Sequence, residues 1–300
     1  MGQFGKVLTA MVTPFNDSGD LDLDVARNLA QWLVSNGNDG LVIAGTTGES
    51  PTLTHDEQAS LIACVVSAVD APVIAGAGSN DTSAAIELTE RADQAGASAI
   101  LSVTPYYNRP SQEGLLEHFR AIAGATDLPI VLYDIPVRSG RKIETETLLE
   151  LAHTVDNIVA LKDAAGDPAE TAYFLSQAPE DFEVYSGDDS LTLPLMAIGA
   201  VGVVGVATHW TGPEHQRMML AIENGDLIEA KAINRNLQKS FNYESTQEAP
   251  NPIPAKMMMR LLGFQVGRGR PPLNVVPDDL QSLAEEVLSQ TEVGQTLGNG

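Results

Sequence analysis

The chain has 300 residues, of which 43% are hydrophobic and 19% charged, a composition typical of a soluble globular protein with a large core. Its formal net charge is −23, from 40 acidic and 17 basic side chains, and a surface of this sign repels nucleic acid. The apolar runs are too short to span a membrane and no targeting segment opens the chain, so we expect a cytoplasmic protein with neither nucleic acid nor membrane as partner.

Short β-branched apolar runs recur along the chain and alternate with amphipathic segments. Most runs are continuously apolar, which is typical of strands buried on both faces. The segments between them carry helix signals, such as the capping box from Thr54 to Glu57 and the terminal Gly37 of the segment 22–37. The predicted strands are 7–14, 40–45, 72–78, 99–105, 129–136, 158–164, 183–189 and 202–208.

Eight strand–helix repeats predict an α/β fold, the TIM (β/α)8 barrel. An open doubly wound sheet usually has fewer strands, and no G-x-G-x-x-G follows the first strand. We expect the barrel to occupy residues 1–225 and residues 226–300 to form a C-terminal helical extension packed on it. The additional helices are predicted at 227–241, 255–263 and 277–290.

In this fold the catalytic groups lie at the C-terminal ends of the strands, and polar side chains gather at those places. The motifs are Gly-Thr-Thr-Gly-Glu-Ser at 45–50, Thr-Pro-Tyr-Tyr-Asn at 104–108, Tyr-Asp-Ile-Pro-Val-Arg-Ser-Gly at 133–140, Lys-Asp at 162–163 and Ser-Gly-Asp-Asp at 186–189. The five histidines fall in no metal-ligand spacing, so we expect neither metal nor cofactor. Asp188 and Asp189 resemble a glycosidase pair, but adjacent residues on a strand point to opposite faces.

Lys162 is the strongest candidate for a catalytic residue, because it interrupts an apolar strand, whereas the other five lysines lie near termini, in loops or on helices. Burial in a barrel lowers the pKa of a lysine and leaves a neutral amine that can attack a carbonyl as a Schiff-base nucleophile. A structural ion pair or a phosphate contact is the alternative role. Tyr133 and Thr46 are suited to move protons for the imine. The alternative roles are packing for Tyr133 and a tight turn for Thr46. Arg138 suits a substrate carboxylate, with a surface salt bridge as its alternative.

The motifs G-T-T-G-E-S, T-P-Y-Y-N-R-P, Y-D-I-P-V-R-S-G, the strand lysine, S-G-D-D and N-P-I-P together resemble the 4-hydroxy-tetrahydrodipicolinate synthase (dihydrodipicolinate synthase) family, within the N-acetylneuraminate lyase superfamily. The resemblance implies a lyase of lysine and diaminopimelate biosynthesis. It joins pyruvate to L-aspartate-4-semialdehyde in a class I (Schiff-base) aldol condensation that gives 4-hydroxy-tetrahydrodipicolinate.

The resemblance also implies roles for single residues. Lys162 forms the imine, and Tyr133, Thr46 and Tyr107 form a proton relay. Tyr107 reaches into the site of a neighbouring subunit, which requires at least a dimer, and the family is commonly a homotetramer built as a dimer of dimers. Family members often have Asn where this chain has Asp134, and we expect that difference to have a modest effect.

The residues that the resemblance implies for substrate binding surround the same strand ends. Thr47 holds the pyruvate carboxylate and Arg138 the carboxylate of the semialdehyde, while Gly187, Asp188 and Val204 line the pocket. 

Many family members are inhibited by lysine at a site between two subunits, where this chain has His55, Asn80 and Tyr106. Gln58 and Ala84 replace the His and Glu that sensitive members often carry. Without a carboxylate at position 84 the lysine ammonium loses a partner, so we expect weak or absent feedback inhibition.

Three alternatives remain open. Sister enzymes that act on sugar acids, such as N-acetylneuraminate lyase, 2-keto-3-deoxygluconate aldolase or 5-dehydro-4-deoxyglucarate dehydratase, share the lysine and tyrosine, but Arg138 and the pair Tyr106-Tyr107 favour the synthase. A catalytically silent barrel, acting as a regulatory or scaffold subunit, tends to lose the nucleophile that this chain keeps. A metal-dependent aldolase requires a ligand cluster that the sequence does not offer.

Overall fold

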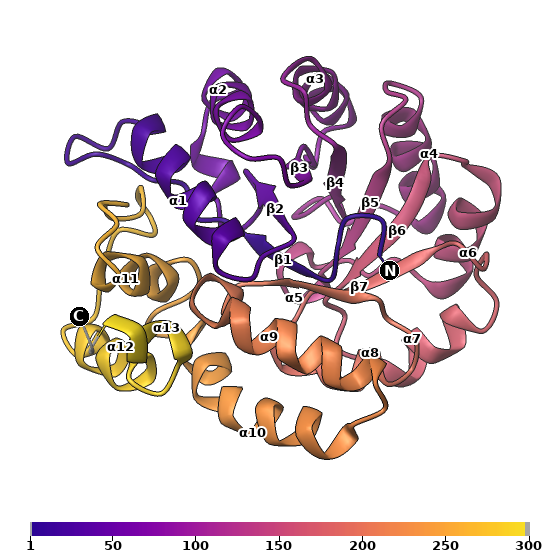
Figure 1. Ribbon diagram of the computed structural model, residues 1–300. Coiled ribbons are helices and arrows are strands. Elements are labelled where there is room, and N and C mark those ends of the chain that lie inside the picture. Colours follow the sequence, from indigo (N-terminus) through magenta and orange to yellow (C-terminus); the bar gives the residue numbers. More distant parts are fainter. Residues whose placement is uncertain (1, 298–300) are drawn as a thin grey trace.

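Eight parallel strands close into a barrel in the computed structural model, which describes residues 2–297 (Figure 1). Each strand pairs with the next, and β8 pairs with β1 through Val7 and Val203, so the described sheet has no free edge. The strands are β1 (Val7–Ala10), β2 (Gly40–Ile43), β3 (Val73–Gly76), β4 (Ala99–Val103), β5 (Ile130–Asp134), β6 (Ile158–Asp163), β7 (Glu183–Ser186) and β8 (Gly202–Gly205). All eight lie within the predicted segments, which confirms the (β/α)8 barrel.

Helices surround the barrel and cover its outer face (Figure 1). The predicted capping box is present, since Glu57 N donates to Thr54 Oγ1 at 3.2 Å and Thr54 N donates to Glu57 Oε2 at 2.8 Å. The helices are α1 (Leu23–Ser35), α2 (His55–Val66), α3 (Thr82–Gln94), α4 (Gln112–Ala123), α5 (Pro136–Ser139), α6 (Thr145–Thr154), α7 (Pro168–Leu175), α8 (Thr192–Met196) and α9 (Thr208–Glu223), with short 3-10 turns η1 (Ser50–Thr52) and η2 (Asp189–Leu191). Helix α9 is kinked at Thr211, where φ is −128°, after its first helical turn.

Four more helices follow, α10 (Leu227–Tyr243), α11 (Ile253–Leu261), α12 (Leu280–Leu288) and α13 (Glu292–Leu297). They confirm the additional C-terminal helices, and α11, α12 and α13 gather on one side of the barrel (Figure 1). Helix α10 packs along α9, where Trp210 Nε1 donates to Ser240 Oγ at 3.1 Å. The division of the chain at residue 225 stays a prediction. Among the described residues, no helix combines the length and apolarity that crossing a membrane requires.

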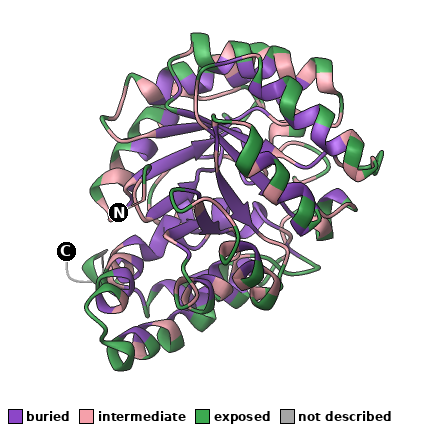
Figure 2. Cartoon of the chain, turned by 90° about the vertical axis from the view of Figure 1, so that its right-hand side faces the viewer, coloured by how far each residue is buried: buried purple, intermediate pink, exposed green. Residues whose placement is uncertain are grey.

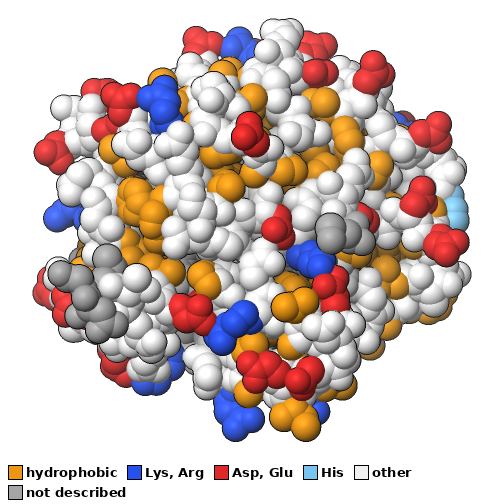
Figure 3. All heavy atoms as spheres, viewed as in Figure 1, with side chains coloured by type: hydrophobic (Ala, Val, Ile, Leu, Met, Phe, Trp, Pro, Cys, Tyr) orange, Lys and Arg blue, Asp and Glu red, His pale blue; other side chains and the backbone are white. Residues whose placement is uncertain are grey.

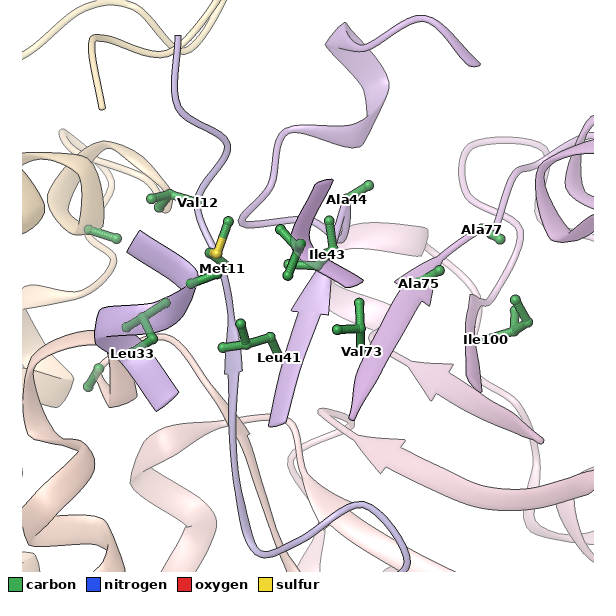
Figure 4. Close-up of a cluster of buried hydrophobic side chains, with 14 of the residues drawn as sticks. Met11, Val12, Leu33, Leu41, Ile43, Ala44, Val73, Ala75, Ala77 and Ile100 are labelled. Carbon is green, nitrogen blue, oxygen red and sulfur yellow. The ribbon is translucent and has the colours of Figure 1, made fainter. Parts of the chain in front are cut away.

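The core has two layers, one inside the barrel and one between the strands and the helices. The strands are buried, whereas the outward faces of the helices are exposed (Figure 2). Side chains of a strand alternate between its faces. On β2, Val42 belongs to the cluster inside the barrel, whereas Leu41 and Ile43 belong to the cluster between strands and helices, together with Leu33 of α1 (Figure 4). Acidic side chains are spread over the face of the molecule that Figure 3 shows, in keeping with the net charge of −23.

The same alternation decides which groups enter the barrel. On β6, Ala160 is in the inner cluster and Leu161 in the outer one, so Lys162 points inward. On β5, Tyr133 is in the inner cluster, and Asp134 therefore faces the helices. The strand pattern thus delivers a lysine and a tyrosine to one mouth of the barrel.

Candidate active site

Lys162 is almost fully buried near the end of β6, with 5% of its surface exposed. Its Nζ lies 4.3 Å from the centre of the Tyr133 ring. Burial lowers the pKa of the amine to about 8, although the carboxyl of Asp189 opposes that shift; the charge of Arg138 lowers the pKa further. A substantial neutral fraction is therefore present near physiological pH, as a nucleophilic amine requires.

Tyr133 is the direct neighbour of Lys162 across the β5–β6 pairing. Burial raises the pKa of its phenol to about 12, while the charge of Arg138 and a side-chain hydrogen bond with Thr46 lower it. The phenol therefore stays protonated at neutral pH and is linked to the Thr46 hydroxyl. The structure thus brings together three of the predicted residues, Lys162, Tyr133 and Thr46.

The turn that carries Thr46 and Thr47 follows β2 and is held by several contacts. Thr47 is buried, and its Oγ1 accepts a hydrogen bond of 2.8 Å from Asn251 Nδ2. Thr13 Oγ1 donates to Gly48 O at 2.6 Å. Gly76 on β3 gives the chain room to enter the turn, because a Cβ there would lie 2.4 Å from Ala44 O. 

Of the three residues predicted to line the pocket, Gly187 and Asp188 directly follow β7, and Val204 lies on β8. Val204 is inside the barrel, in the cluster that contains Tyr133. A Cβ at Gly187 would lie 2.9 Å from Ala164 Cβ, so only glycine fits. The carboxylate of Asp188 is engaged locally, accepting from Ser190 N at 2.9 Å and from Ser190 Oγ at 2.7 Å. 

Asp189 is a buried acid, which the predicted strand 183–189 would place on the face opposite to Asp188. Strand β7 ends at Ser186, so Asp189 instead turns under β8, where a Cβ on Gly205 would lie 2.5 Å from its Oδ1. Its Oδ2 accepts from Val206 N at 2.7 Å, and burial raises the pKa of its carboxyl. The small residue at position 205 was the signal that a side chain packs there.

A second acid, Glu244, is hydrogen-bonded to Asp189. Burial and the neighbouring carboxyl of Asp189 raise the pKa of Glu244 well above its usual range. His215 Nε2 lies 3.7 Å from Asp189 Oδ1 and is fully buried. Asp189 and Glu244 are both close enough to Lys162 to raise the pKa of its amine, against the effect of burial.

Three predicted residues lie at the exposed rim. Arg138 on α5 is exposed, and its charge lowers the pKa of both Lys162 and Tyr133. Tyr107 is 89% exposed, in a left-handed conformation with φ of 73°, and its N donates to Ser139 O at 3.2 Å. Its side chain is not packed into the barrel of its own chain. Tyr106, beside it, is half-buried.

Asp134 faces α6 rather than the barrel interior. Its carboxylate accepts from Ile143 N at 3.2 Å and lies 3.2 Å from Lys142 Nζ. Burial raises the pKa of this carboxyl to about 6, although Lys142 opposes the shift. The departure from the family pattern at this position therefore lies on the outer side of β5, away from the barrel interior.

The predicted regulatory residues lie near the start of α2 and the β3–α3 loop. His55 Nδ1 lies 3.2 Å from Glu87 Oε1, and Asn80 O accepts from Asn108 Nδ2 at 2.7 Å. Glu87 stands one helical turn beyond Ala84, and its carboxylate is paired with His55 and Arg91. Gln58 is buried and donates to Ser50 O at 3.1 Å. 

No group of three or more His, Cys, Asp or Glu side chains within residues 2–297 has the arrangement of a metal site. The chemistry available at the barrel mouth is that of an amine, a phenol, hydroxyls and carboxyls.

The chain is similar to known proteins of one family over nearly its whole length. The model of the dihydrodipicolinate synthetase family matches residues 3–291. The 4-hydroxy-tetrahydrodipicolinate synthase of Moorella thermoacetica is 52% identical over 273 residues, which are 90% of this chain and 92% of that protein. The dihydrodipicolinate synthase of Cyanidioschyzon merolae, solved with lysine bound, is 44% identical with a TM-score of 0.94, covering 97% of this chain and 99% of that one. A monomeric dihydrodipicolinate synthase variant is 35% identical with a TM-score of 0.91 and covers 96% of both chains.

Proposed function

The chain belongs to the dihydrodipicolinate synthetase family, and from this we propose that it condenses pyruvate with L-aspartate-4-semialdehyde to give 4-hydroxy-tetrahydrodipicolinate, in lysine and diaminopimelate biosynthesis in the cytoplasm. The observation that carries the proposal is the buried Lys162, whose Nζ lies 4.3 Å from the Tyr133 ring at the barrel mouth. Arg138 at the rim supports an acceptor that carries a carboxylate.

The reaction begins with pyruvate bound to the turn after β2. Asn251 donates to Thr47 Oγ1, so the hydrogen of the Thr47 hydroxyl is free to bind the carboxylate. Neutral Lys162 then attacks the keto carbon and forms a carbinolamine. Water leaves when the phenol of Tyr133 protonates the departing oxygen, and the imine remains. 

The second half of the reaction uses the imine as an electron sink. The phenolate left on Tyr133 takes a proton from the methyl group of the protonated imine, which gives an enamine. The enamine carbon attacks the aldehyde of the semialdehyde while Arg138 holds the carboxylate, and the new alkoxide takes a proton from the Tyr133 relay. The amino group of the condensed product then attacks the imine carbon, closes the ring and releases Lys162. Thr46 links Tyr133 to the next member of the proton relay.

Tyr107 completes that relay from a neighbouring subunit, so the active form is at least a dimer and is proposed to be a homotetramer. The 89% exposure of its side chain and its left-handed backbone, which presents the ring outward, support this arrangement.

The acceptor is tested by trapping. We expect pyruvate and borohydride to add a pyruvyl group to the wild-type chain, and L-aspartate-4-semialdehyde to suppress that adduct because it consumes the enamine. Intact-protein mass spectrometry measures both. An adduct that the semialdehyde does not reduce would favour an enzyme acting on sugar acids, and an absent adduct would favour a catalytically silent barrel.

Feedback inhibition is expected to be weak, with half-inhibition by lysine above about 1 mM, because Glu87 is already paired with His55 and Arg91 and cannot replace a free carboxylate at position 84. Assays of the initial rate against lysine concentration measure it. The Ala84→Glu variant is the matched control and should be inhibited at lower concentration. Half-inhibition of the wild type well below that value would contradict this expectation.

A further inference from the structure

A second buried lysine, Lys256, contacts Glu49, the residue that follows the turn Thr46–Thr47–Gly48. Lys256 Nζ of α11 is 2.6 Å from Glu49 Oε1, and both side chains are almost fully buried. The ammonium also donates to Arg268 O at 3.1 Å and lies 4.2 Å from the centre of the Phe15 ring. The other carboxylate oxygen of Glu49 accepts from Arg270 N at 2.8 Å. 

This ion pair joins parts of the chain that are far apart in sequence. Glu49 directly follows the turn Thr46–Thr47–Gly48. Its backbone is left-handed, with φ of 57°, a strained conformation for a residue other than glycine. Such a conformation persists only where surrounding contacts hold it. Lys256 belongs to the C-terminal helices. 

Asn251, two residues before α11, reaches the same turn. Its Nδ2 donates to Thr47 Oγ1 at 2.8 Å, in a buried contact. The C-terminal segment therefore contacts the turn through a hydrogen bond to Thr47 and an ion pair with Glu49.

A buried ion pair is a poor source of stability, because desolvation of the two charges offsets much of their attraction. The ion pair instead fixes the position of its two partners relative to one another, since moving either partner leaves a buried charge unpaired. Asn251 acts similarly on the Thr47 hydroxyl, because its N–H occupies a lone pair and directs the hydroxyl hydrogen elsewhere.

We propose that Glu49, Lys256 and Asn251 are positioning residues, which anchor the turn Thr46–Thr47–Gly48 to the segment leading into α11 and so set the affinity for the carboxylate of pyruvate. This inference rests on the proposed function. It assigns the segment around α11 a part in substrate binding, beyond covering one side of the barrel.

Asn251→Leu is the first test, with Asn38→Leu as its matched control. Asn38 is equally buried, and its Nδ2 donates to Leu33 O at 2.9 Å in the segment that enters β2, at the opposite end of the barrel. We expect Asn251→Leu to raise KM for pyruvate about 10-fold or more and to change kcat little, because the Thr47 hydroxyl is then no longer directed toward the carboxylate. Asn38→Leu should lower Tm but leave KM unchanged. Equal KM values in the two variants would overturn the assignment of Asn251.

The ion pair is tested by the double variant Glu49→Gln/Lys256→Met, which keeps the volumes and leaves no buried charge. We expect it to fold and to form the borohydride-trapped pyruvyl adduct about 10-fold more slowly at subsaturating pyruvate, with recovery at high pyruvate. An unchanged trapping rate would overturn the role of the pair. If even the wild type forms no adduct, the proposed function itself fails, so the two failures are distinguishable.

Discussion

Replacing Lys162 by alanine is expected to abolish the pyruvyl adduct and to lower kcat/KM roughly 10³-fold or more, because the covalent route to the enamine is lost. Lys142→Ala is the control at the same end of the barrel, where Lys142 pairs with Asp134 and Glu170 outside the pocket. That variant should keep the adduct. Mass spectrometry after borohydride reduction, and steady-state kinetics, measure the two effects. 

The pKa of a lysine does not by itself identify the nucleophile here. Burial lowers the pKa of Lys162 and of Lys256 alike to about 8. Lys256 Nζ, however, is held against Glu49 at 2.6 Å and bonded to a carbonyl, so no lone pair faces a substrate. Peptide mapping should therefore place the adduct on Lys162 alone, and an adduct on Lys256 in the wild type would contradict the proposed mechanism.

The same assignment fixes the pH dependence of imine formation. Below a pKa of about 8 the amine of Lys162 is protonated, so the trapping rate should fall roughly tenfold for each pH unit below that value and level off above it. A profile that is flat between pH 6 and 8 would show that the attacking amine has another pKa.

The barrel was predictable because its strands are buried on both faces and therefore read as uninterrupted apolar runs. Lys162 stood out for the same reason, since a charge inside such a run has to be explained. The alternation of side chains along β6 then sufficed to point it inward, next to Tyr133 on β5. At Lys162 and Tyr133, the alternation along the strand and the position at the C-terminal end of a barrel strand both predict a side chain inside the barrel mouth.

What the sequence did not reveal are pairings between distant segments. Glu49 belongs to a recognisable motif, but its partner Lys256 looked like an ordinary helix lysine. Asp189 was misjudged because the predicted strand extended past Ser186, where β7 in fact ends and the chain turns. Tertiary contacts of this kind have no periodic signature, so only the folded chain shows them.

Tyr133→Phe is expected to lower kcat by roughly 10²- to 10⁴-fold, because in the proposed mechanism the phenol delivers and removes protons at the imine nitrogen and the leaving oxygen. The ring itself remains, so its contact with Lys162 and the packing of the inner cluster should be kept. Binding of pyruvate, measured by calorimetry or as KM, should change little. Stopped-flow or quenched trapping should show slow imine formation rather than weak binding.

Tyr185→Phe is the matched control, because Tyr185 is the neighbour of Lys162 on the other side, across the β6–β7 pairing. Both tyrosines are buried in the same inner cluster. The hydroxyl of Tyr185, however, donates to Glu183 Oε2 at 2.9 Å and accepts from Phe4 N at 3.4 Å, at the end of the barrel where the strands begin. Its loss should reduce stability and leave kcat within about threefold of the wild type, since no reacting atom is near. If both variants lost activity equally, the barrel would need its tyrosines for packing alone, and the proton relay would have to be assigned elsewhere.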